Sequence, residues 1–88
     1  MYSGKVKRVT LRWSNKLAGV CMDRFGNDVH MAYEDDEHFT TTTDVSLSDQ
    51  FYGWLAGLGT GVEIVSPPEA REKMKKLLND ITGLYEKN

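Results

Sequence analysis

The stretch from Ser48 to Glu69 limits the folds open to this chain more than any other part of it. Ser48 is a common helix cap, and the apolar residues after it repeat at helical spacing: Phe51, Trp54, Leu55 and Leu58. Gly59 suits the left-handed position that ends many helices, and the apolar residues within 62–65 suit a short strand. Ser66-Pro67-Pro68-Glu69 then predicts a capping box that starts a second helix. The stretch therefore predicts a helix, a tight turn, a strand and another helix.

The residues before this stretch predict three strands and one helix. Residues 5–13 alternate between apolar and polar types, which is the period of a half-buried strand. Ser14 can cap a helix that Gly26 ends. The alternating residues 29–34 and 38–45 predict two further strands, and the acidic residues between them predict a turn.

This acidic turn also sets the expected pairing of its two strands. If Tyr33 faces the core beside Phe39, the turn must hold an odd number of residues, and Asp35–Glu37 meets that condition. The same pairing places His30 opposite Thr42.

From residue 66 onward we expect a long helix with one apolar stripe and a charged opposite face. The stripe consists of Ala70, Met74, Leu77, Leu78, Ile81, Leu84 and Tyr85. This helix either joins the helical layer or reaches toward a partner. The element order β-α-β-β-α-β-α predicts an α+β fold, a ferredoxin-like βαββαβ sandwich with a four-stranded antiparallel sheet and an added C-terminal helix. The expected core consists of Val9, Leu11, Trp13, Phe39, Trp54, Leu55, Ile64, Leu77 and Ile81.

Composition narrows the class of protein. A length of 88 residues provides for one domain with one modest core. A net charge of −2 and a pI near 5.6 argue against a free-standing nucleic-acid binder, which usually has a basic face. No apolar run is long enough to span a membrane, and the N-terminus lacks the hydrophobic segment of a signal peptide. The single cysteine, Cys21, excludes an internal disulfide and is expected to be a small buried hydrophobe. We therefore expect a cytoplasmic domain.

Several groupings resemble ligand sites, but each has a simpler structural explanation. Gly57–Gly61 contains three glycines, yet it closes a helix and opens a strand, the reverse of a phosphate-binding loop. In the expected pairing, the backbone positions of His30 and His38 are about 13 Å apart, which is too far for the two side chains to share one zinc ion. Glu34–Glu37 is expected to be a solvated hairpin tip, with His38 facing Glu34 across the strands. We expect no metal and no cofactor.

An enzymatic role is not expected either. Neither histidine can be tied by its position to a nucleophile. An acylphosphatase-type hydrolase would need a glycine-rich phosphate loop with arginine between the first strand and the first helix, and Arg12–Lys16 stands there without that loop. We therefore assign no catalytic residue.

The face of the sheet away from the helices is expected to carry mixed polar side chains: Arg8, Thr10, Arg12, His30, Ala32, Glu34, His38, Thr40, Thr42 and Glu63. RNA-binding sheets of this topology stack bases on exposed aromatic residues, and this face has none. It either meets water alone or packs against another domain or a second copy. The expected association surface consists of Arg8, Thr10, Arg12, Glu34, Thr40, Thr42 and Glu63. Arg24 is either a favourable helix-end charge or a contact for an effector or adjacent domain.

Four segments recur in this order in one protein family: Val9–Arg12, Asp23–Gly26, Phe51–Leu55 with Gly59, and Val62–Pro67. They resemble the C-terminal extension, the WCX domain, that follows the WYL domain in bacterial transcriptional regulators. The likeness extends from about Gly4 to Tyr85. By this resemblance, residues 1–5 are the end of an interdomain connection, and residues 6–88 form a single ferredoxin-like domain of a longer regulator.

The resemblance also implies a function. Such regulators carry an N-terminal winged helix-turn-helix, a WYL domain that senses a ligand or nucleic acid, and this extension, which is associated with dimerisation and signal relay. The implied role is a non-catalytic regulatory and dimerisation domain, with its own WYL domain and a second copy as partners. DNA would be reached only through a helix-turn-helix domain that these residues do not include. Two alternatives stay open: a small-molecule-binding sensor module of ferredoxin-like fold, and a hydrolase of acylphosphatase type.

Overall fold

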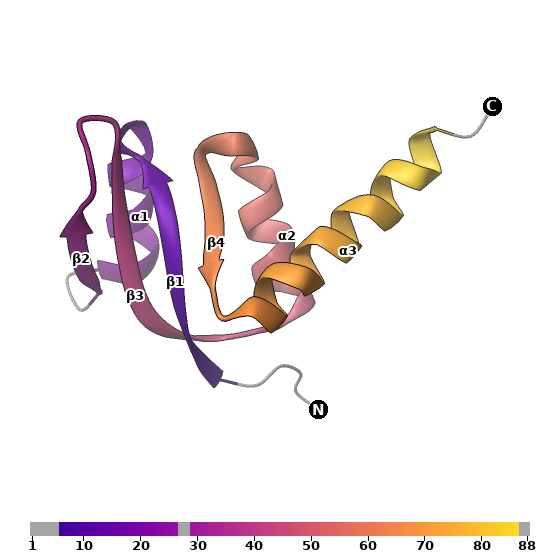
Figure 1. The fold of residues 1–88 in the computed structure, drawn as a ribbon, viewed down its shortest axis with the longest axis horizontal. Coiled ribbons are helices and arrows are strands. Elements are labelled where there is room, and N and C mark those ends of the chain that lie inside the picture. The colour runs from indigo at the N-terminus through magenta and orange to yellow at the C-terminus, as the bar shows by residue number, and fades with distance from the viewer. Residues whose placement is uncertain (1–5, 27–28, 87–88) are drawn as a thin grey trace.

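A computed structural model describes residues 6–26 and 29–86 and places four strands and three helices in them (Figure 1). Their bounds are β1 Val6–Ser14, α1 Ala18–Phe25, β2 His30–Tyr33, β3 His38–Ser46, α2 Asp49–Gly57, β4 Val62–Ser66 and α3 Pro68–Tyr85. The strands form one sheet in the order β2-β3-β1-β4, and every neighbouring pair is antiparallel. The predicted α+β fold with a four-stranded antiparallel sheet is confirmed.

The pairing of β2 with β3 follows the predicted register. Tyr33 lies opposite Phe39, and His30 lies opposite Thr42. The acidic turn Asp35–Glu37 therefore has the length that the alternating pattern required.

Burial along β2 differs from the prediction. Tyr33 was expected to face the core, yet it is 76% exposed, and its hydroxyl donates a hydrogen bond of 2.9 Å to Asp36 Oδ1. Met31 is also exposed, whereas Val29, just before the strand, is buried. Because β2 is the outermost strand and only four residues long, the helical layer covers little of it. The expectation of a buried Tyr33 was wrong.

The core is centred on Trp13, which lies in β1 and has no exposed surface. Its ring stacks on Phe39 with centroids 6.0 Å apart, and Phe25 and Trp54 approach it edge-on. The buried hydrophobic residues are Val9, Leu11, Trp13, Cys21, Val29, Phe39, Val45, Phe51, Tyr52, Leu55, Ile64 and Ala70. Trp54 and Leu77 are only half-buried, and Tyr52, at 3% exposure, was not predicted.

Both ends of α2 agree with the sequence, whereas the start of α3 differs from it. Ser48 Oγ accepts a hydrogen bond from the amide of Phe51, and Gly59 has a φ of 72°, the left-handed conformation that glycine adopts without strain. The predicted capping box is wrong, because Ser66 still belongs to β4 and the N-cap of α3 is Pro67. The main-chain oxygen of Pro67 instead accepts hydrogen bonds from the amides of Ala70 and Arg71.

The third helix starts against the sheet and then leaves it. Ala70 is 1% exposed, Met74 and Leu77 are half-buried, and the apolar residues after them are exposed. Figure 1 shows α3 extending away from β4 and α2 toward the C-terminus. Ile81, predicted to be buried, is 40% exposed because it lies beyond the reach of the sheet and of α2. The second half of this helix therefore does not join the helical layer (Figure 1), and its reach toward a partner stays a prediction.

Candidate functional site

The polar face of the sheet brings together most of the residues expected to form an association surface. Strand pairing places Arg12 beside Thr40 on one side and Glu63 on the other, and Thr10 opposite Thr42. The hydroxyl groups of Thr10 and Thr42 lie 3.1 Å apart, within hydrogen-bonding distance. The helices α1 and α2 lie on the other side of the sheet (Figure 1). This arrangement gives the face a centre of threonines.

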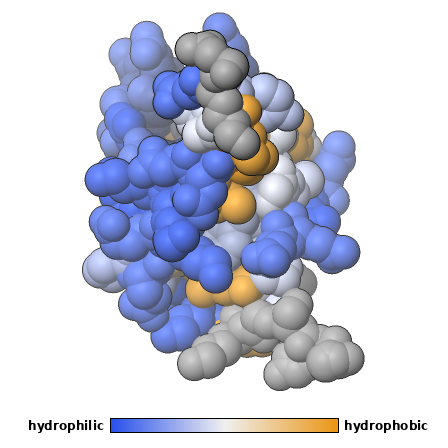
Figure 2. Space-filling model, turned by 90° about the vertical axis from the view of Figure 1, so that its right-hand side faces the viewer, coloured by the Kyte–Doolittle hydropathy of each residue, from blue (hydrophilic) through white to orange (hydrophobic). Residues whose placement is uncertain are grey.

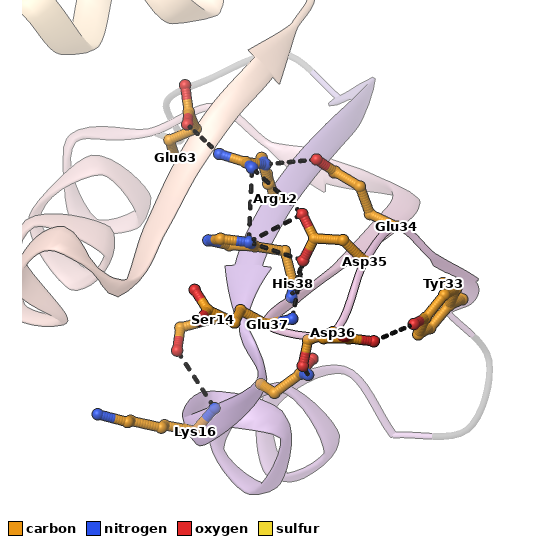
Figure 3. Close-up of polar contacts among 11 residues, drawn as sticks. Arg12, Ser14, Lys16, Tyr33, Glu34, Asp35, Asp36, Glu37, His38 and Glu63 are labelled. Atoms are coloured by element: carbon orange, nitrogen blue, oxygen red, sulfur yellow. Dashed lines mark hydrogen bonds and ion pairs between the residues drawn. The ribbon is translucent and has the colours of Figure 1, made fainter.

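Arg12 is the hub of the ion pairs on this face (Figure 3). Its Nε donates to Glu34 Oε2 at 2.8 Å, and its Nη1 lies 3.5 Å from Glu63 Oε1. Its Nη2 lies 3.9 Å from Asp35 Oδ2 and 3.5 Å from His38 Nδ1. The hydrogen bond to Glu34 is the main cause that raises the pKa of the Arg12 guanidinium. One guanidinium thus links β1, the hairpin tip and β4.

Asp35 organises the hairpin tip. One of its carboxylate oxygens, Oδ1, accepts the main-chain amides of Glu37 and His38, each at 2.8 Å, and lies 3.1 Å from His38 Nδ1. These contacts, led by the amide of Glu37, lower the pKa of the Asp35 carboxyl. Glu34 lies across the strands from His38, as expected, and its amide donates to the main-chain oxygen of His38 at 3.2 Å, while the His38 ring contacts Asp35 and Arg12.

The ion pairs continue from the sheet to α3. Arg71 Nη1 donates to Glu63 Oε2 at 2.9 Å and to the main-chain oxygen of Ile64 at 2.8 Å. The hydrogen bond from Arg71 is the main cause that lowers the pKa of the Glu63 carboxyl. The sequence indicated neither Arg71 nor Asp35 as a member of this network, since each stood among ordinary charged residues of a helix and a turn.

The charges that were expected to pair with another molecule are therefore already paired within the chain. Arg12 is held by Glu34 and Glu63, and Arg8 lies 3.5 Å from Asp44. All of these side chains are at least one-third exposed, so each pair contributes little to stability. The face is close to neutral overall and is bordered by ion pairs.

Arg24 lies on the helical side of the molecule, away from this network. Its guanidinium carbon is 4.9 Å from the centroid of the Trp54 ring, and no carboxylate of residues 6–26 or 29–86 forms an ion pair with it. A shallow cavity of about 480 Å³ lies beside it, lined by Arg24, Phe25, Val45, Ser46, Ser48, Gln50 and Phe51. The guanidinium lies over the Trp54 ring as a cation–π contact, and its N–H groups can still donate to another acceptor.

Among the residues that the structure describes, no three His, Cys, Asp or Glu side chains are grouped so that they could hold a metal ion. Cys21 is fully buried on α1, and burial raises the pKa of its thiol. Within the same residues, no helix has both the length and the apolar character needed to cross a bilayer.

The sequence model of the WCX domain matches residues 5–82. The chain belongs to the WCX domain family. The match runs from β1 into the last turn of α3 and so includes both the Arg12 network and Arg24. No curated protein matches this WCX domain.

Proposed function

We propose that this WCX domain is a non-catalytic regulatory and dimerisation domain of a bacterial, cytoplasmic WYL-type transcriptional regulator. In this proposal the fold is ferredoxin-like, since the chain order βαββαβ and the strand order β2-β3-β1-β4 agree with that arrangement. DNA is bound by a separate helix-turn-helix domain, and a WYL domain supplies the signal. The family match supports the regulatory role.

The observation that carries the proposal is the polar face of the sheet, which lies on the side away from α1 and α2 (Figure 1). Its centre consists of Thr10, Thr40 and Thr42, all half-buried, and its border is a set of ion pairs around Arg12. Charged side chains that are already held in ion pairs within the chain lose less conformational entropy when another domain packs on them. We propose that the face packs against the regulator's own WYL domain or against a second copy.

A non-catalytic role is supported by the partners of the ionisable side chains. The ring of His38 contacts Asp35 and Arg12, and its recorded partners among the described residues include no serine, threonine or cysteine that it could activate. A hydrolase of acylphosphatase type would need a phosphate-binding loop between the first strand and the first helix. The segment Arg12–Lys16 instead ends β1 and passes into a short 3-10 turn, in which Ser14 Oγ accepts a hydrogen bond from the amide of Lys16.

The test is sedimentation equilibrium of the chain over a range of concentrations, with Thr10→Arg/Thr42→Arg as the variant. The two arginines would place bulk and like charge at the centre of the face, so the variant should associate less than the wild type. The exposed substitution Lys76→Arg, on α3, is the matched control. If the double variant associates as strongly as the wild type, the face is not a surface for self-association.

A second candidate function has one observation in its favour. The cavity beside Arg24 combines a guanidinium edge with the side chains of Ser48 and Gln50, which suits a small carboxylate or phosphate ligand. In a full-length regulator, Arg24→Ala should weaken the response to the effector while the melting temperature changes little, since Arg24 is exposed. An unchanged response would leave Arg24 as a helix-end charge stacked on Trp54.

A further inference from the structure

The second half of α3 carries large apolar side chains that the rest of the described chain leaves uncovered. Leu84 is 64% and Tyr85 is 83% exposed, and Leu78 and Ile81 are exposed over about two-fifths of their surface. We refer to these four residues as the ridge. Figure 2, which looks onto the side from which α3 projects, shows hydrophobic patches along its middle, bordered by hydrophilic surface.

A groove lies beside the first half of the same helix, between α3, α2 and β4. It has a volume of about 810 Å³. Its apolar lining consists of Leu55, Ala56, Val62, Ile64, Met74 and Leu78. Leu78 belongs to both the groove and the ridge, so the two features form one continuous apolar surface along α3.

We infer that this surface binds a second copy of the chain by reciprocal exchange, with the ridge of each copy lying in the groove of the other. The groove follows α3 up to Asn79, and the ridge follows it from Leu78 to Tyr85. Two α3 helices placed antiparallel about a two-fold axis near Leu78 therefore bring each ridge beside the other copy's groove. A two-fold interface requires such a self-complementary surface.

The area that the exchange would bury lies at the lower limit for a specific dimer. Together, the exposed parts of the ridge equal about two fully exposed large side chains, or roughly 400 Å². The groove that receives them exposes a smaller area and shares Leu78 with the ridge, which gives about 500 Å² per copy and about 1,000 Å² in total, the least that a specific interface usually buries. The charged side chains of Glu72 and Lys75 border the groove and would form the polar rim.

This inference does not depend on the sheet-face proposal, because no ridge residue lies on the sheet. The test is sedimentation equilibrium of the 88-residue chain and of Leu84→Glu. The wild type should form dimers, and Leu84→Glu should weaken association by about a hundredfold, since symmetry places the new charge in both grooves. Gly83→Glu is the matched control: it adds the same charge to the adjacent residue, where a side chain meets open space, and should leave the dimer intact.

A substitution in the groove tests the exchange itself. Ala56→Arg should fill the groove and also give a monomer, and circular dichroism would verify that both variants keep their helical content. In an equimolar mixture, Leu84→Glu and Ala56→Arg should recover part of the association, because one intact ridge then meets one intact groove.

Four results would overturn the inference. They are a wild type that stays monomeric at every concentration, a Leu84→Glu chain that associates like the wild type, an Ala56→Arg chain that does so, and a mixture that recovers nothing. Loss of the dimer in Thr10→Arg/Thr42→Arg alone, with Leu84→Glu unaffected, would overturn the inference and leave the sheet-face proposal standing. Loss of the dimer in Leu84→Glu alone, with Thr10→Arg/Thr42→Arg unaffected, would support the exchange and exclude the sheet face as a self-association surface.

Discussion

The hydrogen bond between Trp13 and Thr41 is a sensitive test of how the core is built. Trp13 Nε1 donates to Thr41 Oγ1 at 2.9 Å, and neither residue is more than 1% exposed, so water cannot replace either partner. Thr41→Val keeps the shape of the side chain but leaves the indole N–H buried without an acceptor. That loss costs about 1–3 kcal/mol, and the added methyl group returns up to about 1 kcal/mol. We expect a net loss of about 1–2 kcal/mol from a total stability of roughly 4–13 kcal/mol for a domain of this length.

The assay is urea unfolding followed by circular dichroism, with Trp13→Phe and the double variant completing a cycle. Because Trp13→Phe removes the donor, Thr41→Val should cost about 1–2 kcal/mol less in that background. Thr43→Val is the control, a half-buried threonine on the same strand for which no side-chain hydrogen bond to another described residue is recorded. A loss below about 0.5 kcal/mol for Thr41→Val, or strict additivity in the cycle, would refute the reasoning.

Three further predictions follow from burial and charge. Leu55→Ala should lower the free energy of unfolding by about 2–5 kcal/mol, because Leu55 is 2% exposed and its loss leaves a cavity; denaturant unfolding measures this. The Glu63 carboxyl should titrate below its ordinary pKa of 4.5 when followed by NMR, and Arg71→Met should raise that midpoint. Since the folded pKa is lowered, this contribution to stability is full above pH 4.5 and is lost as the pH falls through the folded value. Cys21 should react slowly with a thiol reagent in the native chain and rapidly in urea, because burial both shields the thiol and raises its pKa.

The strand pairing could be predicted because local patterns determine it. The alternation on either side of Asp35–Glu37 fixes which residues face the core, and the turn length then fixes that Tyr33 meets Phe39. Gly59 likewise identified a helix end, since its positive φ is a backbone requirement that the residue type reveals.

How far other elements bury the apolar face of each helix and strand could not be predicted, because this depends on where elements distant in the sequence end. Tyr33 and Ile81 both lie on the apolar side of their elements, yet both are exposed, since one is on an edge strand and the other is beyond the sheet. Tyr52 shows the converse: it stood outside the predicted stripe of α2 and is buried. Periodicity identifies a direction on a helix or strand and carries no information about what lies in that direction.

The candidate site could be predicted only in part, because local patterns show which face a residue lies on but not which distant element meets it. Alternation alone placed Arg12, Glu34 and Glu63 together on one face, and the strand order brings them within reach of one another. That Arg71 joins them depends on the angle at which α3 leaves β4, which no local pattern encodes.

The contact of Arg71 with β4 also affects how the sheet ends. An edge strand presents main-chain groups without partners, and such groups invite the addition of a strand from another molecule. Here the Arg71 guanidinium donates a hydrogen bond to the main-chain oxygen of Ile64 in β4. The opposite edge of the sheet is β2, which is only four residues long. Growth of the sheet from chain to chain is therefore discouraged at both ends, by an ionic side chain at one and by shortness at the other. Assemblies of this domain should accordingly form through faces and helices, and cross-β aggregation should begin only after α3 detaches.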